Sequence, residues 1–476
     1  MTELKKKIRL RTVISAGAGL ALATVSYTSN MQVASYMAGD SGWMAIVIAG
    51  LISFLAAFCF AELVGMFPTA AGIKLFIERA FNEKAALVFG TVYMTISVAV
   101  VGAETFILSS VLATAFPVPR VFWIFFFLIT IALINIRGVT MAGLTQDITT
   151  YAMFAALIGL SVYALAKNDF QLTTPLTPGS GMGMAQAVAI GVFLYLGFEW
   201  VTPLAEETTD FKLIPRGMFG AIILLGLSYA LFNIAMTSTV SKAVLTKSPI
   251  PHVLFGQALF GKAGIMLMMI MSILASVTTF NAGVMTASRF IYAMARDRAL
   301  PKVFSNLHPT YATPWPAIVA LLTVATAVSL AVNFTGQYKV LIFLGAAVEC
   351  MIYVVMGASV LGLRKRNPET ERVFKVPFGR LIPWAVIIVY GLLFVLIFIP
   401  DPANPGDAHA QLLALISLVV VFALTFGYVF KVVPALRAKY EAEARKRQKR
   451  RPGRPAATGA APGGGGMTPG GSAVPQ

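Results

Sequence analysis

Carboxylic acids stand inside long apolar runs of this 476-residue chain, and Glu104 is the clearest case. It lies near the middle of the run Ala85–Ala115, beside the small residues Gly102 and Ala103. A charged side chain at the centre of a membrane helix costs about 2.5–3.5 kcal/mol on insertion scales, so an acid retained there is a functional candidate. We expect Glu104 to bind an amine or to carry a proton; a structural hydrogen bond to a neighbouring helix is the alternative.

Further candidates lie where two apolar runs are interrupted. The first run contains Gly17-Ala18-Gly19 and then a polar stretch, Thr24 to Asn30, and the sixth contains Gly197 and Pro203. Unwound backbone at membrane depth is tolerated only inside protein or around a cavity. We expect both helices to break there, with the breaks facing each other near the membrane midplane; close packing of small residues is the alternative for the first run. The candidate substrate-binding residues are Ala23, Thr24, Ser26, Tyr27, Glu104, Gly197, Phe198, Glu199 and Trp200.

Aromatic and hydroxyl side chains near these positions suggest secondary roles. Tyr27, Phe198 and Trp200 can cover a cavity and contact a bound amine through their ring faces, although packing explains most aromatics in such a chain. The hydroxyl groups of Ser276, Thr278 and Thr279 are candidates for holding a coupling sodium ion, although Ser and Thr also serve in helix packing. Other acids, namely Glu62, Glu206 and Glu207, are expected to cap helices or to pair with basic loops, and the role of Glu349 is left open.

The elements that must position these groups are twelve apolar runs. About 20 helical residues cross a hydrocarbon core about 30 Å thick, and lipid forces backbone groups to bond within the segment. The chain is 58% hydrophobic and only 12% charged, far below the charged share of a soluble domain. This predicts an all-α polytopic membrane protein. The expected helices are Thr12–Ala38, Trp43–Phe67, Ala85–Ala115, Val121–Ile136, Thr145–Ala166, Met184–Leu204, Gly217–Val240, Ala263–Ala293, Pro316–Asn333, Val340–Leu363, Leu381–Ile399 and Gln411–Val432.

The net charge of +17 follows topology and does not indicate nucleic-acid binding. Basic residues gather in alternate connectors, as they do on the cytoplasmic side of membrane proteins. The assignment predicts that both termini are cytoplasmic in a multi-pass protein of the cell membrane. Only six of the 37 basic residues fall on the other side: Arg120, Lys167, Lys242, Lys247, Lys262 and Lys339.

Catalytic and metal-binding signatures are missing from the sequence. The three histidines, His252, His308 and His409, lie in separate connectors, and the two cysteines, Cys59 and Cys350, lie in apolar runs where buried thiols are expected. We therefore expect neither an enzyme nor a metal site, cofactor or disulfide framework.

Four ordered patches carry a resemblance to a known family. They are Phe60-Ala61-Glu62-Leu63 with Met66 to Gly72, Phe193 to Glu199 with Ile214-Pro215-Arg216, Ala287-Ser288-Arg289 with Tyr292 to Asp297, and Arg364 to Pro368 with Phe374 to Pro377. In these patches the chain resembles the amino acid, polyamine and organocation transporter superfamily, amino acid permease type. The resemblance implies a leucine-transporter-like fold, with a five-plus-five inverted repeat, two peripheral helices, and alternating access around a site between helices 1, 3, 6, 8 and 10.

It also implies a secondary-active transporter of amino acids or related amines, with a small-molecule substrate, a coupling proton or sodium ion, and the lipid bilayer as partners. The alternative within transport is a carrier of polyamines, amines or inorganic cations. The alternative from a different functional class is a nontransporting membrane sensor. The implied organisation is residues 1–11 as a basic cytoplasmic N-terminus, 12–166 and 167–363 as the two repeats, 364–432 as a connector with the peripheral helices, and 433–476 as a disordered cytoplasmic tail.

Two departures from the family pattern bear on the substrate and the coupling ion. Relatives that bind amino acids usually break helix 1 at a Gly-Ser-Gly type sequence whose amides hold the substrate carboxylate, whereas Thr24-Val25-Ser26 takes that place here. The position of a lysine that stands in for sodium in some relatives falls on Met153. A substrate other than an ordinary α-amino acid becomes more credible, and coupling through such a lysine is not expected.

Overall fold

The computed structural model describes residues 8–37, 41–67, 72–137, 143–170, 181–208, 210, 212–402 and 404–449. Within these residues every regular element is helical, and the only β-type contact is an isolated bridge between Ile8 and Thr208. The first half contains α1 (Leu10–Ala21), α2 (Thr24–Ser35), α3 (Gly42–Met66), α4 (Gly72–Ala80), α5 (Glu83–Ala115), α6 (Arg120–Ile136) and α7 (Gly143–Lys167). The second contains α8 (Gly181–Gly191), η1 (Val192–Tyr195), η2 (Phe198–Glu207), α9 (Leu213–Thr239), α10 (Lys242–Leu245), α11 (Pro251–Phe260), α12 (Lys262–Arg296), η3 (Lys302–Ser305), α13 (Trp315–Thr335), α14 (Tyr338–Arg366), α15 (Leu381–Ile397), η4 (Pro405–Asp407), α16 (Ala408–Gly427), η5 (Tyr428–Val432) and α17 (Val433–Lys449).

The helices are those of a multi-pass membrane protein. Nine helical spans in the described part of the chain are long and apolar enough to cross a bilayer, and the bent pair α1–α2 makes a tenth. The apolar helices α6 and α15 occupy the predicted fourth and eleventh spans but have only 17 residues each. The all-α membrane fold is confirmed, whereas the number twelve stays a prediction.

The outward-facing side chains are largely apolar, as expected for helices surrounded by lipid. On α16 the residues Leu412, Ile416, Val420 and Leu424 are each about half exposed or more, at a spacing of four residues that keeps them on one face of the helix. Apolar faces of this kind are stable only against lipid or protein.

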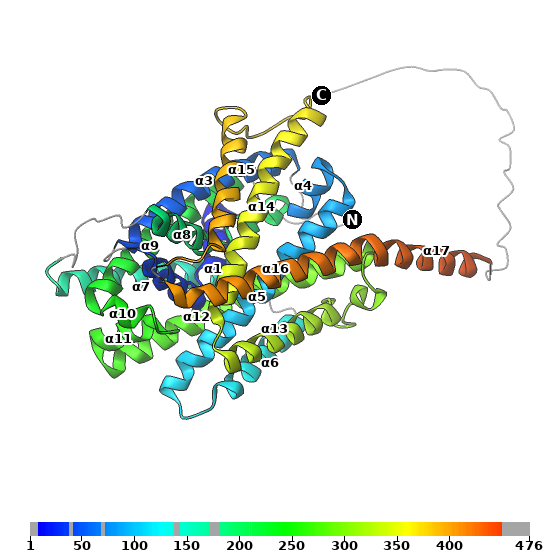
Figure 1. Cartoon of the computed structure of the whole chain (residues 1–476). Helices are drawn as coiled ribbons and strands as arrows, with labels where there is room; N and C mark the ends of the chain where they lie inside the picture. The colour runs from blue at the N-terminus through cyan, green and yellow to red at the C-terminus, as the bar shows by residue number, and fades with distance from the viewer. Residues whose placement is uncertain are drawn as a thin grey trace, which may run out of the picture.

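Beyond α16 the chain stays helical for longer than predicted. A π-helical turn, η5, leads into α17, and the resulting rod projects from the bundle in Figure 1. The expectation of disorder from residue 433 is therefore wrong for residues 433–449, while 450–476 lie outside the described residues. The reason is local: Ala, Glu, Lys, Arg and Gln are strong helix formers, and Pro434 stands in the first turn, where proline is tolerated.

Both predicted helix breaks are present. The axes of α1 and α2 meet at 65°, with Leu22 and Ala23 between them, so Thr24 to Tyr27 form the first turn of α2 and do not themselves unwind. In the sixth span α8 tightens into η1 and is interrupted at Leu196 and Gly197 before η2 begins. These two interrupted elements touch, since α1 packs against η2.

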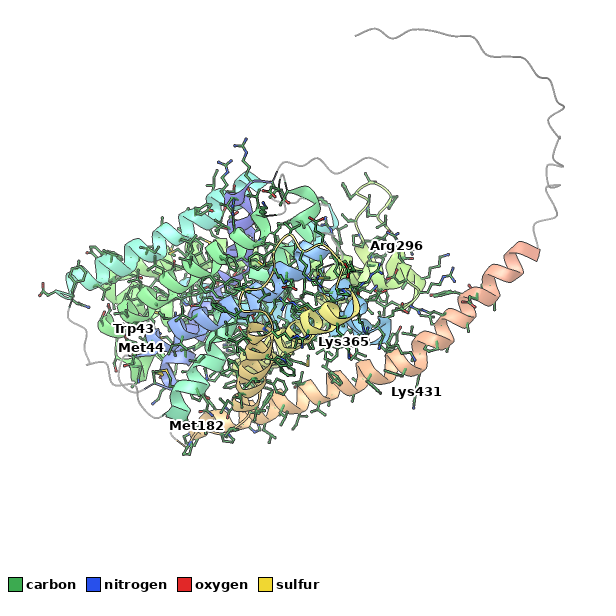
Figure 2. All side chains as sticks on the ribbon, turned by 90° about the horizontal axis from the view of Figure 1, so that it is seen from above. Trp43, Met44, Met182, Arg296, Lys365 and Lys431 are labelled. Atoms are coloured by element: carbon green, nitrogen blue, oxygen red, sulfur yellow. The ribbon has the colours of Figure 1, made fainter. Side chains whose placement is uncertain are left out.

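The remaining helices enclose this junction. The long helix α5 packs against α12, α13 and α14, while α1 lies against α7 and α9. Figure 2 shows Arg296, Lys365 and Lys431 toward one end of the bundle and Trp43, Met44 and Met182 toward the other.

Candidate functional site

Glu104 closes the first break by capping α2. Its Oε1 accepts a hydrogen bond from the Thr24 backbone N–H (2.9 Å) and its Oε2 accepts one from the Val25 N–H (2.7 Å). The Ser276 hydroxyl also donates to Oε1, and the Glu104 side chain is 0% exposed. Because the first amides of a helix lack internal partners and carry about half a positive charge, a carboxylate satisfies them well. Glu104 thus makes the structural hydrogen bonds to neighbouring helices that the alternative expects, to backbone amides of α2 and to a hydroxyl group of α12.

Hydroxyl groups satisfy the carbonyl side of the same break. The Ala21 carbonyl accepts hydrogen bonds from Tyr229 Oη (2.6 Å) and Ser26 Oγ (2.8 Å). The hydroxyl groups of Thr278 and Thr279 on α12 lie 3.4 and 3.3 Å from the carbonyl oxygens of Gly19 and Leu20, although Thr278 makes its shorter bond, of 2.8 Å, to the Ala275 carbonyl of its own helix. Two of the predicted ion-binding residues thus face carbonyls at the end of a half-helix, an arrangement suited to sodium. Ser276, the third, belongs to the Glu104 cap instead.

Glu199 at the second break belongs to a different cluster. It accepts hydrogen bonds from Tyr93 Oη (2.6 Å) and from the Gly197 N–H (3.2 Å). Tyr353 Oη lies 3.3 Å from Glu199 Oε2 and 2.5 Å from Glu349 Oε1. One phenol proton cannot serve two carboxylates fully, so a proton on one of the two acids completes the bridge.

These buried acids have no cationic partner in the described part of the chain. Glu104, Glu199 and Glu349 are all 0% exposed and form none of the described ion pairs, and one oxygen of Glu349 has no hydrogen-bond partner among the described residues. Glu199 and Glu349 are linked through Tyr353, and two like charges so placed in a low-dielectric interior do not both ionise. The interior around the breaks is therefore suited to a bound cation or to protons.

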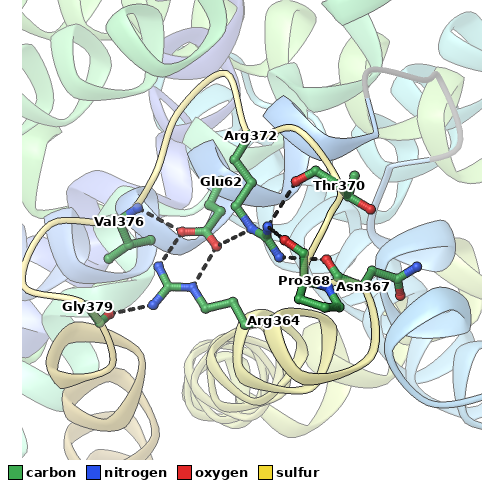
Figure 3. Close-up of polar contacts among 8 residues, drawn as sticks. All are labelled: Glu62, Arg364, Asn367, Pro368, Thr370, Arg372, Val376 and Gly379. Atoms are coloured by element: carbon green, nitrogen blue, oxygen red, sulfur yellow. Dashed lines mark hydrogen bonds and ion pairs between the residues drawn. The ribbon is translucent and has the colours of Figure 1, made fainter.

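Glu62 behaves differently and serves the structure. Arg364 forms a two-point contact with its carboxylate, at 2.8 and 2.5 Å, Arg372 lies 3.2 Å away, and the Val376 N–H donates at 2.7 Å (Figure 3). The expected pairing of Glu62 with a basic loop is confirmed. The side chains of Glu206 and Glu207, for which the same role was expected, lie outside the described residues.

The aromatic candidates divide between the two breaks. The ring of Tyr27 packs against Phe232 and His252, with centroid distances of 5.5 and 5.2 Å. Phe198 packs edge-on against Phe60 at 6.0 Å, and Trp200 lies beside Tyr93 at 5.7 Å. Tyr27 therefore accompanies Glu104, while Phe198 and Trp200 accompany Glu199.

Sequence reasoning missed Tyr93, Tyr353 and His252 as members of these clusters. Glu349 carried a signal, since an acid in an apolar run is exceptional. The tyrosines carried none, because aromatic residues are frequent throughout the chain.

Comparison with known proteins agrees with this architecture. Residues 8–424 match the family model described as amino acid permease. The serine/threonine exchanger SteT of Bacillus subtilis is 26% identical over 405 residues, covering 83% of this chain and 91% of the relative. The human large neutral amino acids transporter small subunit 2 is 27% identical over 82% of this chain and 76% of its own, and the methylthioribose transporter of Bacillus subtilis is 24% identical over 77% and 83%.

Among solved structures, the Eremococcus coleocola manganese transporter shares the fold. Its TM-score is 0.55 at 12% sequence identity, and the similarity covers 92% of this chain and 98% of the transporter. At this level of sequence identity, structural similarity supports a shared fold and nothing about the substrate.

Proposed function

We propose that this chain, which belongs to the amino acid permease family, is a secondary-active transporter that moves amino acids or related amines across the cell membrane by alternating access. The observation that carries the proposal is the contact between two broken helices, α1–α2 and α8–η2. Broken half-helices expose backbone groups at mid-depth, where secondary transporters hold their substrates and ions. The named relatives carry out transport, and the chain covers most of their length.

The central site comprises both breaks. Ala23, Thr24 and Ser26 with Glu104 and Tyr27 provide a polar end, and Gly197, Phe198, Glu199 and Trp200 provide the opposite wall. Residues 12–166 and 167–363 act as the two inverted units, each contributing one broken helix. Rocking of one unit against the other would open the site to alternate sides.

Both termini are cytoplasmic in this proposal, which rests on the distribution of basic residues. Four of the six basic residues assigned to the opposite side lie at helix ends: Arg120 begins α6, Lys167 ends α7, Lys262 begins α12 and Lys339 lies in the first turn of α14.

The coupling ion in this proposal is a proton held by Glu199, Tyr353 and Glu349. Support comes from the single phenol proton shared between two buried carboxyl groups. Sodium at Thr278 and Thr279 is the second candidate, favoured by the α1 carbonyls that these hydroxyls face.

Liposomes with imposed gradients separate the two ions. With a proton gradient, Glu349→Gln should lose at least about tenfold in accumulation but retain exchange at equal pH, because only the coupled proton is removed. Thr278→Ala should leave both activities unchanged. Dependence on a sodium gradient, lost in Thr278→Ala, would assign coupling to sodium.

Ligand-dependent thermal stabilisation tests the function itself. A ligand that binds only the folded protein raises its apparent stability, by about 2.7 kcal/mol at a concentration 100 times Kd. Purified protein should be stabilised by members of an amino acid and amine panel, and liposomes should exchange the same compounds. Binding without any exchange in liposomes would favour a membrane sensor.

A further inference from the structure

Glu104 occupies the place where a broken helix would otherwise hold an anion. Helix N-termini bind carboxylates and phosphates, and in transporters with interrupted helices they point at the anionic groups of the substrate. Here the Thr24 and Val25 amides at the start of α2 already donate to the two oxygens of the Glu104 carboxylate, at 2.9 and 2.7 Å. The protein thus supplies its own carboxylate at this position.

We propose that the substrate of this transporter is an amine that lacks a free carboxylate and presents its ammonium group to Glu104. The inference rests on the proposed transport function and narrows its substrate class.

The sign of the local charge supports an amine. A bare helix N-terminus presents about half a positive charge, whereas the same end capped by a full carboxylate has a net charge near minus one half. Burial makes this field stronger than it would be in water. A second carboxylate arriving with an amino acid would meet repulsion and would find the amides occupied.

Hydrogen-bond counting leaves room for an ammonium group. A carboxylate has about four acceptor positions, of which Oε1 uses two, for the Thr24 N–H and the Ser276 hydroxyl, and Oε2 uses one, for the Val25 N–H. One position on Oε2 stays open to a donor.

Tyr27 adds an independent observation at this place. It lies three residues after Thr24, hence on the same face of α2. Its side chain is 0% exposed, yet its hydroxyl has no hydrogen-bond partner among the described residues. A buried unsatisfied hydroxyl is costly, and a ligand donor would relieve that cost while the ring face favours a cation.

No described buried side chain offers a substrate carboxylate an alternative cation. The buried polar residues include neither Lys nor Arg, and His252 already uses Nε2 to contact the Ser272 hydroxyl at 3.1 Å. The three unpaired acids of the interior all favour positive charge.

Matched pairs of compounds test the inference. Arginine against agmatine, lysine against cadaverine and tyrosine against tyramine differ in the carboxylate alone. The purified wild type should bind the amine of at least one pair with a Kd at least about tenfold lower than that of its amino acid, and liposomes should exchange that amine. Equal or tighter binding of every amino acid would overturn the inference and leave the transport function standing. Failure of both members of every pair to bind or exchange would overturn the inference, and the wider panel of amino acids and amines would then decide whether the transport function stands.

Variants identify the residue responsible. Glu104→Gln, which keeps the side-chain shape, should weaken binding of the amine at least about tenfold, while Glu104→Ala should free the α2 amides and shift the preference toward the amino acid. Ser110→Ala on the same helix, where the hydroxyl only donates to the Phe106 carbonyl, should bind the amine as the wild type does. If Glu104→Ala fails to fold, the Gln variant decides: an unchanged ratio of amine to amino acid affinity contradicts the inference.

Discussion

Gly197 holds a backbone conformation that side chains rarely adopt. Its φ of +124° lies in the region reserved almost entirely for glycine, and it lets the chain turn from η1 into η2. A Cβ added there would lie 2.9 Å from Leu20 Cβ and 3.1 Å from the Gly17 carbonyl oxygen. This one residue therefore permits both the second break and its close approach to the first.

Gly197→Ala should lower stability by about 1–3 kcal/mol through backbone strain, with a further loss from the clash with α1. Transport should fall along with it because the two breaks are forced apart. Gly159→Ala is the matched control, since nothing lies within 4 Å of the added Cβ and alanine favours a helix. Thermal unfolding in detergent measures both variants; equal melting temperatures for Gly197→Ala and the wild type would contradict this account.

At the level of elements, the end of α3 is tied to the connector between α14 and α15. Glu62 comes from α3, Arg364 from the last turn of α14, and Arg372 and Val376 from the connector itself (Figure 3). A buried carboxylate of this kind depends on its partners, because removal of one leaves charge uncompensated.

Arg364→Ala should destabilise the protein by about 2–3 kcal/mol, below the 3–5 kcal/mol typical of a broken buried pair, because Arg372 and the Val376 amide still face Glu62. The neighbouring exposed residue Lys365 provides the control, and Lys365→Ala should change stability by less than about 0.5 kcal/mol. Thermal melts at low and high salt compare the two variants. An Arg364→Ala effect that vanishes in high salt would show that the pair is a weak surface contact.

For the whole molecule, charged contacts gather at one pole of the helix bundle, the end that holds Lys74, Glu83 and Asp297. Contacts join residues far apart in sequence at one pole: Lys74 pairs with Asp297, Arg437 with Glu83, and Arg366 donates to the Phe81 carbonyl. Positive charge gathered at one side of a membrane protein sets its orientation. In the orientation proposed above, this pole faces the cytoplasm.

Cysteine labelling tests the assignment. The native Cys59 and Cys350 are both buried, so the background should be low. In intact cells Gln337→Cys, between α13 and α14, should react with a membrane-impermeant maleimide, whereas Lys302→Cys should react only after permeabilisation. The opposite pattern would invert the topology.

The sequence alone determined the membrane environment, the helical class and the approximate positions of both breaks. Apolar length dictates membrane helices because lipid leaves backbone groups no other partners, and glycine or a polar stretch within such a run weakens the helix locally. Glu104 and Glu199 stood out for the related reason that ionised groups are costly in hydrocarbon. All of these signals are local, and one chain suffices to read them.

Only the tertiary structure decided which groups meet. Glu104 reaches amides 80 residues earlier, Tyr353 bridges Glu349 to an acid 154 residues away from the tyrosine, and Ser276 separates from Thr278 and Thr279 although they share one helix. These pairings depend on the rotation and crossing of packed helices, which hydropathy leaves undetermined because apolar faces pack in many ways. The sequence therefore predicts the breaks. The position of the Glu104 carboxylate at the first break, in contrast, depends on the packing of α5 against α2 and α12.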